Sequence, residues 1–278
     1  MSVAVSIIDA KQDSRRWWVL AIVVAAQFMF VVDAFVVNVA IPSIHAELHA
    51  TIAETQGTIV IYQIGFAALI ITGGRLGDIN GAKPVFLVGI IGFTLASLWC
   101  GLARSGGELV ASRALQGAAA ALMIPQVLAT IHRLFPGAER GRAFGTYGFT
   151  LGFGAATGLA LGGWLLSLDV GGLGWRMILF VNVPIGFVLL AAAWRLMPVI
   201  PGKPGTRLDV AGAGILLLAL LCVLGPLVAG TKILASDDLS GMFGIEMAPA
   251  PLPKRRAISK GKKKVQARRR ALKKKQKN

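Results

Sequence analysis

"WWVLAIVVAAQFMFVVDAFVVNVAI", residues 17–41, is an apolar run long enough to cross the roughly 30 Å hydrocarbon core of a bilayer as a helix. It contains one charged residue, Asp33, and shows no strand-like alternation of polar and apolar residues. In hydrocarbon every backbone N–H and C=O group must be paired within the segment, and such a run satisfies this requirement only as a helix. The run therefore predicts a membrane-spanning α-helix.

Six further apolar runs follow, each close to the ~20 residues that a spanning helix needs. They cover residues 57–74, 84–103, 109–131, 143–168, 177–194 and 210–230. Of the 278 residues, 55% are hydrophobic and only 15% are charged, whereas a soluble domain carries roughly 25% charged residues. Within the seven runs the only charged residues are Asp33 and Arg113. The sequence predicts an all-α membrane protein.

The positive charges between the runs predict the orientation. If the N-terminus is cytoplasmic, the outer loops carry two cations, Arg104 and Arg176, and the cytoplasmic segments carry eleven. The eleven are Lys11, Arg15, Arg16, Arg75, Lys83, Arg133, Arg140, Arg142, Arg195, Lys203 and Arg207. Lys and Arg are enriched on the cytoplasmic side of membrane proteins. We therefore expect a multi-pass protein of the cell membrane with its N-terminus in the cytoplasm.

A charged stretch with several glycines, "GGRLGDINGAKPVF" (73–86), joins the second and third runs. Glycines relieve the backbone where two helices are joined closely, and Pro84 suits the first turn of the next helix. Asp78 is expected near that helix start, where a carboxylate accepts backbone N–H bonds. We expect a tight cytoplasmic loop whose key residues are Gly74, Arg75, Gly77, Asp78, Gly81 and Lys83.

Five stretches resemble motifs of the major facilitator superfamily, in its drug:proton antiporter branch with fourteen helices. The stretch 74–83 is similar to the signature loop between the second and third helices. "VDAFVVNVAIP" (32–42) resembles the first-helix motif, and "LVASRALQGAAAALMIP" (109–125) the fourth-helix motif. "GFGAATGLALGG" (152–163) resembles the fifth-helix antiporter motif, and "GWRMILFVNVPIG" (174–186) the entry to the sixth helix. The resemblance implies the amino-terminal half of such a transporter.

The resemblance also implies a role for the stretch 74–83, which in the family latches the inward-facing gate. Ile79 and Ala82 stand where the family usually has arginines. Arg75 and Lys83 are therefore the cations expected to pair with Asp78.

Asp33 and Arg113 are the candidate coupling residues. An ionised carboxylate inside a spanning helix costs roughly 2.5–3.5 kcal/mol on insertion scales, so Asp33 needs a partner or a proton. Arg113 stays charged at physiological pH and is its natural counter-ion. The resemblance implies that the two residues handle the transported proton, and a purely structural ion pair is the alternative interpretation.

Other polar residues and glycines in the runs are candidates for a cavity or for helix packing. Gly154, Gly158 and Gly162 recur every fourth residue and so share one helix face. Spacing alone predicts static packing on that face, and the resemblance adds a sliding surface between rocking helices. The remaining candidates are Asn38, Gln63, Gln116, Gly117, Gly163 and Asn182.

The resemblance implies proton-coupled efflux of small, drug-like molecules, driven by the proton gradient without a cofactor, by a protein whose partners are the lipid bilayer and the small-molecule substrate. No P-loop, dinucleotide-binding or hydrolase motif appears, and the two cysteines and three histidines lack metal-ligand spacing. We therefore expect neither an enzyme nor a metal site.

The resemblance ends near residue 230, although a complete transporter has two six-helix halves and needs roughly 400 residues. We expect a cytoplasmic segment at 1–16, a six-helix half at 17–197, a loop and seventh helix at 198–230, and a disordered tail at 231–278. The tail carries fifteen Lys or Arg and three acidic residues.

Three interpretations of this organisation remain open. A truncation, frameshift or fusion could have replaced the second half by a basic sequence. The chain could be a half-transporter that pairs with a second half or with itself. It could also be a membrane anchor that does not transport, whose polybasic tail binds acidic lipid or nucleic acid.

Overall fold

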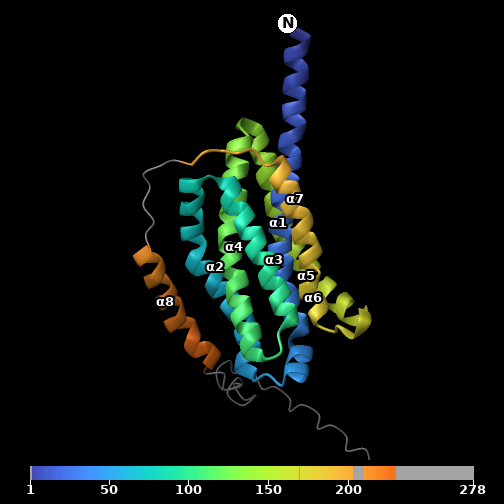
Figure 1. Cartoon of the computed structure of the whole chain (residues 1–278), viewed down its shortest axis with the longest axis vertical. Helices are drawn as coiled ribbons and strands as arrows, with labels where there is room; N and C mark the ends of the chain where they lie inside the picture. Colours follow the sequence, from blue (N-terminus) through green and yellow to red (C-terminus); the bar gives the residue numbers. More distant parts are fainter. Residues whose placement is uncertain (1, 169, 203–209, 230–278) are drawn as a thin grey trace, which may run out of the picture. The chain divides into compact units, whose positions relative to one another are not determined.

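The computed structural model of the chain describes residues 2–168, 170–202 and 210–229 (Figure 1). Every regular element in these ranges is helical, which confirms the predicted all-α fold. The elements are α1 (Ser2–Leu48), α2 (Ile52–Asn80), α3 (Ala82–Leu102), α4 (Gly106–Leu134), α5 (Gly137–Leu168), a short 3-10 helix η1 (Val170–Gly172), α6 (Arg176–Phe180), α7 (Asn182–Leu196) and α8 (Val210–Ala229).

Six segments of the described chain are long and apolar enough to cross a membrane, and they match the first six predicted runs. The first is the part of α1 from Arg15 to Leu48, the next four are α2 to α5, and the sixth is α6 and α7 taken together, Arg176–Leu196. The seventh predicted run forms α8. The predicted tail at 231–278, together with Lys203 and Arg207, lies outside the described residues.

α2 and α4 begin earlier than the corresponding apolar runs, and each is preceded by a polar cap. At the start of α2, the Thr51 hydroxyl accepts a hydrogen bond from the backbone N–H of Glu54 (3.1 Å). The Glu54 carboxylate accepts one in return from the backbone N–H of Thr51 (2.7 Å). Ser105 caps α4 in the same way by accepting from the N–H of Glu108 (3.2 Å). These contacts satisfy N–H groups that have no partner inside the helix.

The core of the bundle lies between α1, α3, α4 and α7. Fully buried apolar side chains from these four helices meet there: Val23, Phe93, Met123 and Ala193. α2 packs against α4, and α5 packs against α1 (Figure 1). The two flanking helices leave more of their surface exposed than the central ones do.

Exposed tryptophans mark both ends of the bundle. Trp18 and Trp194 lie near the start of the α1 span and the end of α7, and both are exposed. Trp99 and Trp164 are exposed near the carboxyl ends of α3 and α5. Tryptophan is enriched at the two membrane–water interfaces, where its ring is partly apolar and partly polar. The bundle therefore has the aromatic belts of a protein that crosses the bilayer.

The prediction of a tight loop at 74–83 is wrong, because α2 continues to Asn80 and α3 begins at Ala82. Only Gly81 separates the two helices, with a φ of 89° that favours glycine. Asp78 therefore lies in the last turn of α2 and does not cap α3, whose N-cap is Gly81. Pro84 lies in the first turn of α3.

Helix packing explains why the glycines in this stretch do not end α2. A side chain at Gly73 would collide with the backbone carbonyl of Ala121, and one at Gly77 with the side chain of Gln126, both on α4. The Gln126 amide donates a hydrogen bond to the Gly73 carbonyl (2.8 Å). Close packing of two helices therefore outweighs the roughly 1 kcal/mol by which glycine disfavours a helix.

Candidate functional site

Asp33 and Arg113 form an ion pair in the middle of the bundle. The guanidinium Nη1 of Arg113 on α4 donates to Oδ2 of Asp33 on α1 at 2.5 Å. The exposed fractions of the two side chains are 0% and 1%. Burial of both charges is tolerable only when each is fully paired and hydrogen-bonded. The structure thus brings together the two charged residues of the apolar runs.

Two amides complete the surroundings of the Asp33 carboxylate. Gln116 on α4 donates from Nε2 to Oδ1 at 3.0 Å. Asn182, the first residue of α7, donates from Nδ2 to the same oxygen at 2.7 Å. The carboxylate thus accepts hydrogen bonds from three side chains of two helices, one of them charged.

The guanidinium of Arg113 is fixed on its other sides as well. Nη1 also donates to Oε1 of Gln116 at 2.7 Å, and Nε donates to the backbone carbonyl of Thr58 on α2 at 3.4 Å. The guanidinium carbon lies 4.0 Å from the centre of the Tyr62 ring, within the range of a cation–π contact. The Tyr62 hydroxyl donates to the carbonyl of Phe30 on α1 (3.3 Å). Helices α1, α2 and α4 thus meet at Arg113.

Two residues that the sequence analysis did not single out join this network from α3. The Ser97 hydroxyl donates to the carbonyl of Leu179 at 2.9 Å and accepts from Nδ2 of Asn182 at 3.1 Å. The Cys100 thiol lies 3.5 Å from Oε1 of Gln116. Ser97 and Cys100 are three residues apart and therefore share one helix face. That spacing within an apolar run is the signal that could have found them.

Two predicted cavity residues lie outside the network. Asn38 is exposed, and its amide donates to the carbonyls of Ala34 and Phe35 in its own helix (3.3 and 3.0 Å). Gln63 is also exposed. Gly117 has a packing role instead, because a side chain there would collide with the Tyr62 carbonyl.

The helix face of α5 that carries Gly154, Gly158 and Gly162 packs against α1. A side chain at Gly154 would lie 3.0 Å from Val31, and one at Gly162 would lie 3.0 Å from the Val36 carbonyl. Gly158 lies against α1 in the same way, at 3.0 Å from the Val32 carbonyl. Gly163 differs, because a side chain there would meet no atom within 4 Å.

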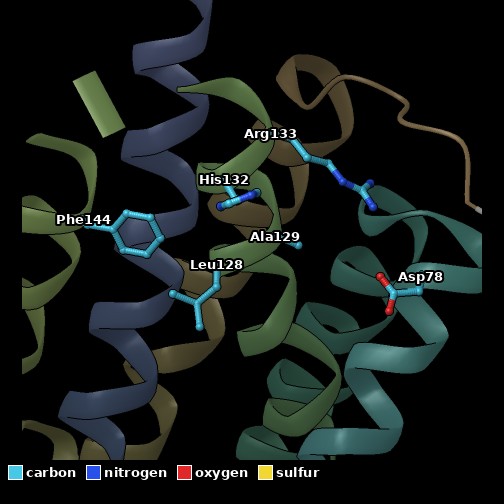
Figure 2. A pocket seen from close by; sticks show the side chains of 6 residues that line it. All are labelled: Asp78, Leu128, Ala129, His132, Arg133 and Phe144. Carbon is cyan, nitrogen blue, oxygen red and sulfur yellow. The ribbon is translucent and has the colours of Figure 1, made fainter. Parts of the chain in front are cut away.

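A pocket of about 430 Å³ opens at the end of the bundle that holds the stretch 74–83. Figure 2 shows Arg133 reaching from α4 toward the end of α2, where Asp78 lies. The lining residues are Asp78, Leu128, Ala129, His132, Arg133 and Phe144. Within the described residues, Asp78 takes part in no ion pair, so the predicted pairing with Arg75 or Lys83 is not formed.

Lys83 binds the end of α7 instead. Its ammonium donates to the backbone carbonyls of Trp194 (2.7 Å) and Met197 (2.8 Å). The last carbonyls of a helix have no partner in the helix and carry the negative end of its dipole, so a cation is favoured there. Arg15 donates to the neighbouring carbonyl of Leu196 at 3.4 Å.

We expect Lys83→Met to lower the free energy of unfolding by about 1 kcal/mol, because the α7 carbonyls lose a charged donor. Chemical unfolding of the purified chain in detergent measures the change. Arg75→Met is the matched control, since Arg75 is exposed near the end of α2, and its effect should stay within about 0.5 kcal/mol. Equal effects of the two substitutions would contradict the capping role of Lys83.

A family profile described as Major Facilitator Superfamily matches residues 23–253 of the chain. The chain belongs to this superfamily. The puromycin resistance protein pur8 of Streptomyces alboniger is 45% identical over 67% of this chain and 36% of its own length. The probable actinorhodin transporter of Streptomyces coelicolor is 40% identical over 79% of this chain and 38% of its own length. The cephamycin export protein CmcT of Amycolatopsis lactamdurans is 40% identical over 70% of this chain and 40% of its own length.

The chain thus spans 36–40% of the length of these three relatives, which fits the amino-terminal half of a superfamily transporter. Among solved structures, the peptide transporter POT in complex with sulfate matches with a TM-score of 0.57 at 14% identity. The match covers 80% of this chain and 48% of that chain, and it supports the major facilitator fold.

Proposed function

We propose that the chain forms the first half of a proton-coupled exporter of small, drug-like molecules. The observation that carries this proposal is the completely buried ion pair of Asp33 and Arg113, held by amides from α4 and α7. The names of the relatives, which refer to puromycin resistance and to cephamycin export, support antibiotic-like substrates. We also propose that the chain works in the cell membrane with its N-terminus in the cytoplasm, as its positive charges indicate.

Charge balance explains how such a site couples a proton to movement. With Asp33 ionised, the pair is neutral, and the bundle encloses no net charge there. When Asp33 takes up a proton, Arg113 becomes an uncompensated cation at a fully buried position. An unpaired buried charge costs several kcal/mol, so the bundle must rearrange to give Arg113 water or another partner. Proton uptake therefore drives a structural change, and the proton gradient can supply the free energy without a cofactor.

A second bundle would supply the other wall of the substrate pathway. Superfamily transporters work by rocking two halves around a site near the middle of the membrane. The relatives are more than twice as long as the segment matched here. We therefore propose a second transporter half, or a second copy of this chain, as the partner.

Export of a fluorescent cationic dye from proteoliposomes with an imposed pH gradient tests the proposal. We expect Asp33→Asn to reduce gradient-dependent export at least tenfold at matched membrane abundance, because an amide takes up no proton. The control is Glu47→Gln, the same chemical change on the same helix. Glu47 pairs with Arg176 at 2.9 Å and is about half exposed.

Gradient-dependent export by Glu47→Gln should remain within twofold of that by the unmodified chain. Unchanged export in Asp33→Asn would reject Asp33 as the coupling residue. If the inserted, unmodified chain exports nothing until a second half is added, the two-half arrangement is supported. If it exports nothing even then, the proposed function is rejected.

A further inference from the structure

We propose that Asn182 is a positioning residue that changes its hydrogen bonds with the protonation state of Asp33. In this role it links the protonation of Asp33 to the hydrogen bonds of the backbone between α6 and α7. This inference rests on the proposed function, since it requires that Asp33 take up a proton.

A chain of hydrogen bonds leads from the Asp33 carboxylate to the backbone of α6. Nδ2 of Asn182 donates to Oδ1 of Asp33 (2.7 Å) and to the Ser97 hydroxyl (3.1 Å). The Ser97 hydroxyl then donates to the Leu179 carbonyl (2.9 Å). All three side chains are at least 97% buried, so water does not compete for these contacts.

This series of hydrogen bonds ends where the helix lacks one of its backbone hydrogen bonds. α6 ends at Phe180, α7 begins at Asn182, and Val181 lies between them with helical φ and ψ of −57° and −33°. Pro184 has no N–H group, so the Phe180 carbonyl lacks its usual helical partner four residues on. Further along α7, Gly186 lies so close to Thr94 of α3 that a side chain would collide with the Thr94 hydroxyl. A change in angle therefore breaks fewer backbone hydrogen bonds at this point than further along α7, where Gly186 is packed against α3.

The amide of Asn182 suits both states of the carboxyl group. An ionised carboxylate only accepts hydrogen bonds, whereas a protonated one must also donate its O–H to an acceptor. An amide offers two N–H donors on one side and a carbonyl acceptor on the other, and a half-turn of the side chain exchanges them.

The other partners of Asp33 cannot make this change as readily. Arg113 carries donors only. Oε1 of Gln116 already accepts from Arg113 (2.7 Å) and lies 3.5 Å from the Cys100 thiol. The other titratable groups near the carboxyl are Cys100 on α3 and Tyr62 on α2, and the Tyr62 hydroxyl already donates to the Phe30 carbonyl. Asn182 is therefore the partner that can turn.

The turn of the amide alters the backbone between α6 and α7. Once the proton is on Asp33, its O–H donates to Oδ1 of Asn182, which now also faces the Ser97 hydroxyl. Two oxygen atoms require a hydrogen between them, so Ser97 donates to Asn182 and no longer to the Leu179 carbonyl. The Leu179 carbonyl loses its side-chain donor, and α6 is free to change its angle to α7.

Infrared difference spectra of the full chain in lipid, taken between the ionised and protonated states, test this inference. The C=O band of protonated Asp33 is identified by its absence in Asp33→Asn. We expect Asn182→Leu to shift this band to higher wavenumber, because the acid loses its acceptor. We also expect a side-chain amide band that moves in asparagine labelled with ¹³C and is lost in both Asn182→Leu and Asp33→Asn.

The control is Asn38→Leu, the same substitution at an exposed asparagine of α1, which should leave both bands unchanged. If Asn182→Leu does not fold, Ser97→Ala provides the test, because it should alter the amide band while the Asp33 band persists. An Asp33 band that is identical in the unmodified chain and in Asn182→Leu, or an amide band unchanged in Ser97→Ala, would overturn the inference and leave the proposed function intact. If the unmodified chain shows no Asp33 band, the proposed function fails and the inference fails with it.

Discussion

Arg113→Leu is expected to destabilise the bundle by about 3–5 kcal/mol, because it leaves the Asp33 carboxylate buried without a counter-ion. The remaining donors to the carboxylate are the neutral amides of Gln116 and Asn182. The loss of stability can be measured by chemical unfolding of the purified protein in detergent.

The double variant Asp33→Asn, Arg113→Leu separates charge from packing. It removes both charges, so most of the lost stability should return, since replacing a whole buried ion pair is often nearly neutral. Arg113 also stacks on Tyr62, and this contact stays lost in the double variant. A double variant as unstable as Arg113→Leu would show that packing, and not the unpaired charge, decides stability here.

Arg113→Lys provides a finer comparison. Lysine keeps the charge but lacks the planar guanidinium, which here contacts Asp33, Gln116 and the Tyr62 ring together. Its stability should therefore fall between those of the unmodified chain and Arg113→Leu.

The contact between Asp33 and Arg113 could be predicted from the sequence because both charges lie in apolar runs and neither can stay alone in hydrocarbon. The helices could be predicted for a related reason, since a long apolar run has one way to satisfy its backbone. An unpaired charge or an unpaired backbone group in hydrocarbon costs several kcal/mol. The sequence pattern of charged and apolar residues is therefore enough to predict both the ion pair and the helices.

The stretch 74–83 could not be predicted in the same way. Its glycines suggest a loop, but the energy that keeps Gly73 and Gly77 helical comes from their packing against Ala121 and Gln126 of α4, which lie more than forty residues further along the chain. The position of Lys83 depends similarly on the end of α7. Such contacts change the free energy of the fold by only about 1 kcal/mol relative to a loop or an unpaired helix end. The spacing of residues in the sequence does not reveal them.

The hydrogen bonds from Ser97 and Asn182 could not be predicted from the sequence for a different reason. Each is a single small polar residue in an apolar run, and such residues often bond helices without any role in a site. Only the packing of α3 and α7 against α1 places them beside Asp33.

The second large effect is expected from Gly117→Leu, at the crossing of α2 and α4. The first side-chain carbon would overlap the carbonyl of Tyr62 and lie 3.2 Å from the backbone nitrogen of Phe66. These are main-chain atoms of α2, so they can yield only if the two helices separate, at a cost of about 3 kcal/mol. The separation would also draw the Tyr62 ring away from Arg113. Chemical unfolding in detergent measures the loss.

Gly163→Leu is the matched control for Gly117→Leu, because a side chain at Gly163 meets no atom within 4 Å. Leucine also favours a helix more than glycine does, by roughly 1 kcal/mol, so this variant should be as stable as the unmodified chain or slightly more stable. If both substitutions had the same effect, the close approach of α2 and α4 could not be what holds Tyr62 against Arg113. If only Gly117→Leu unfolds readily and also loses gradient-dependent export, the backbone crossing and the buried ion pair form one unit, in which helix separation and charge exposure occur together.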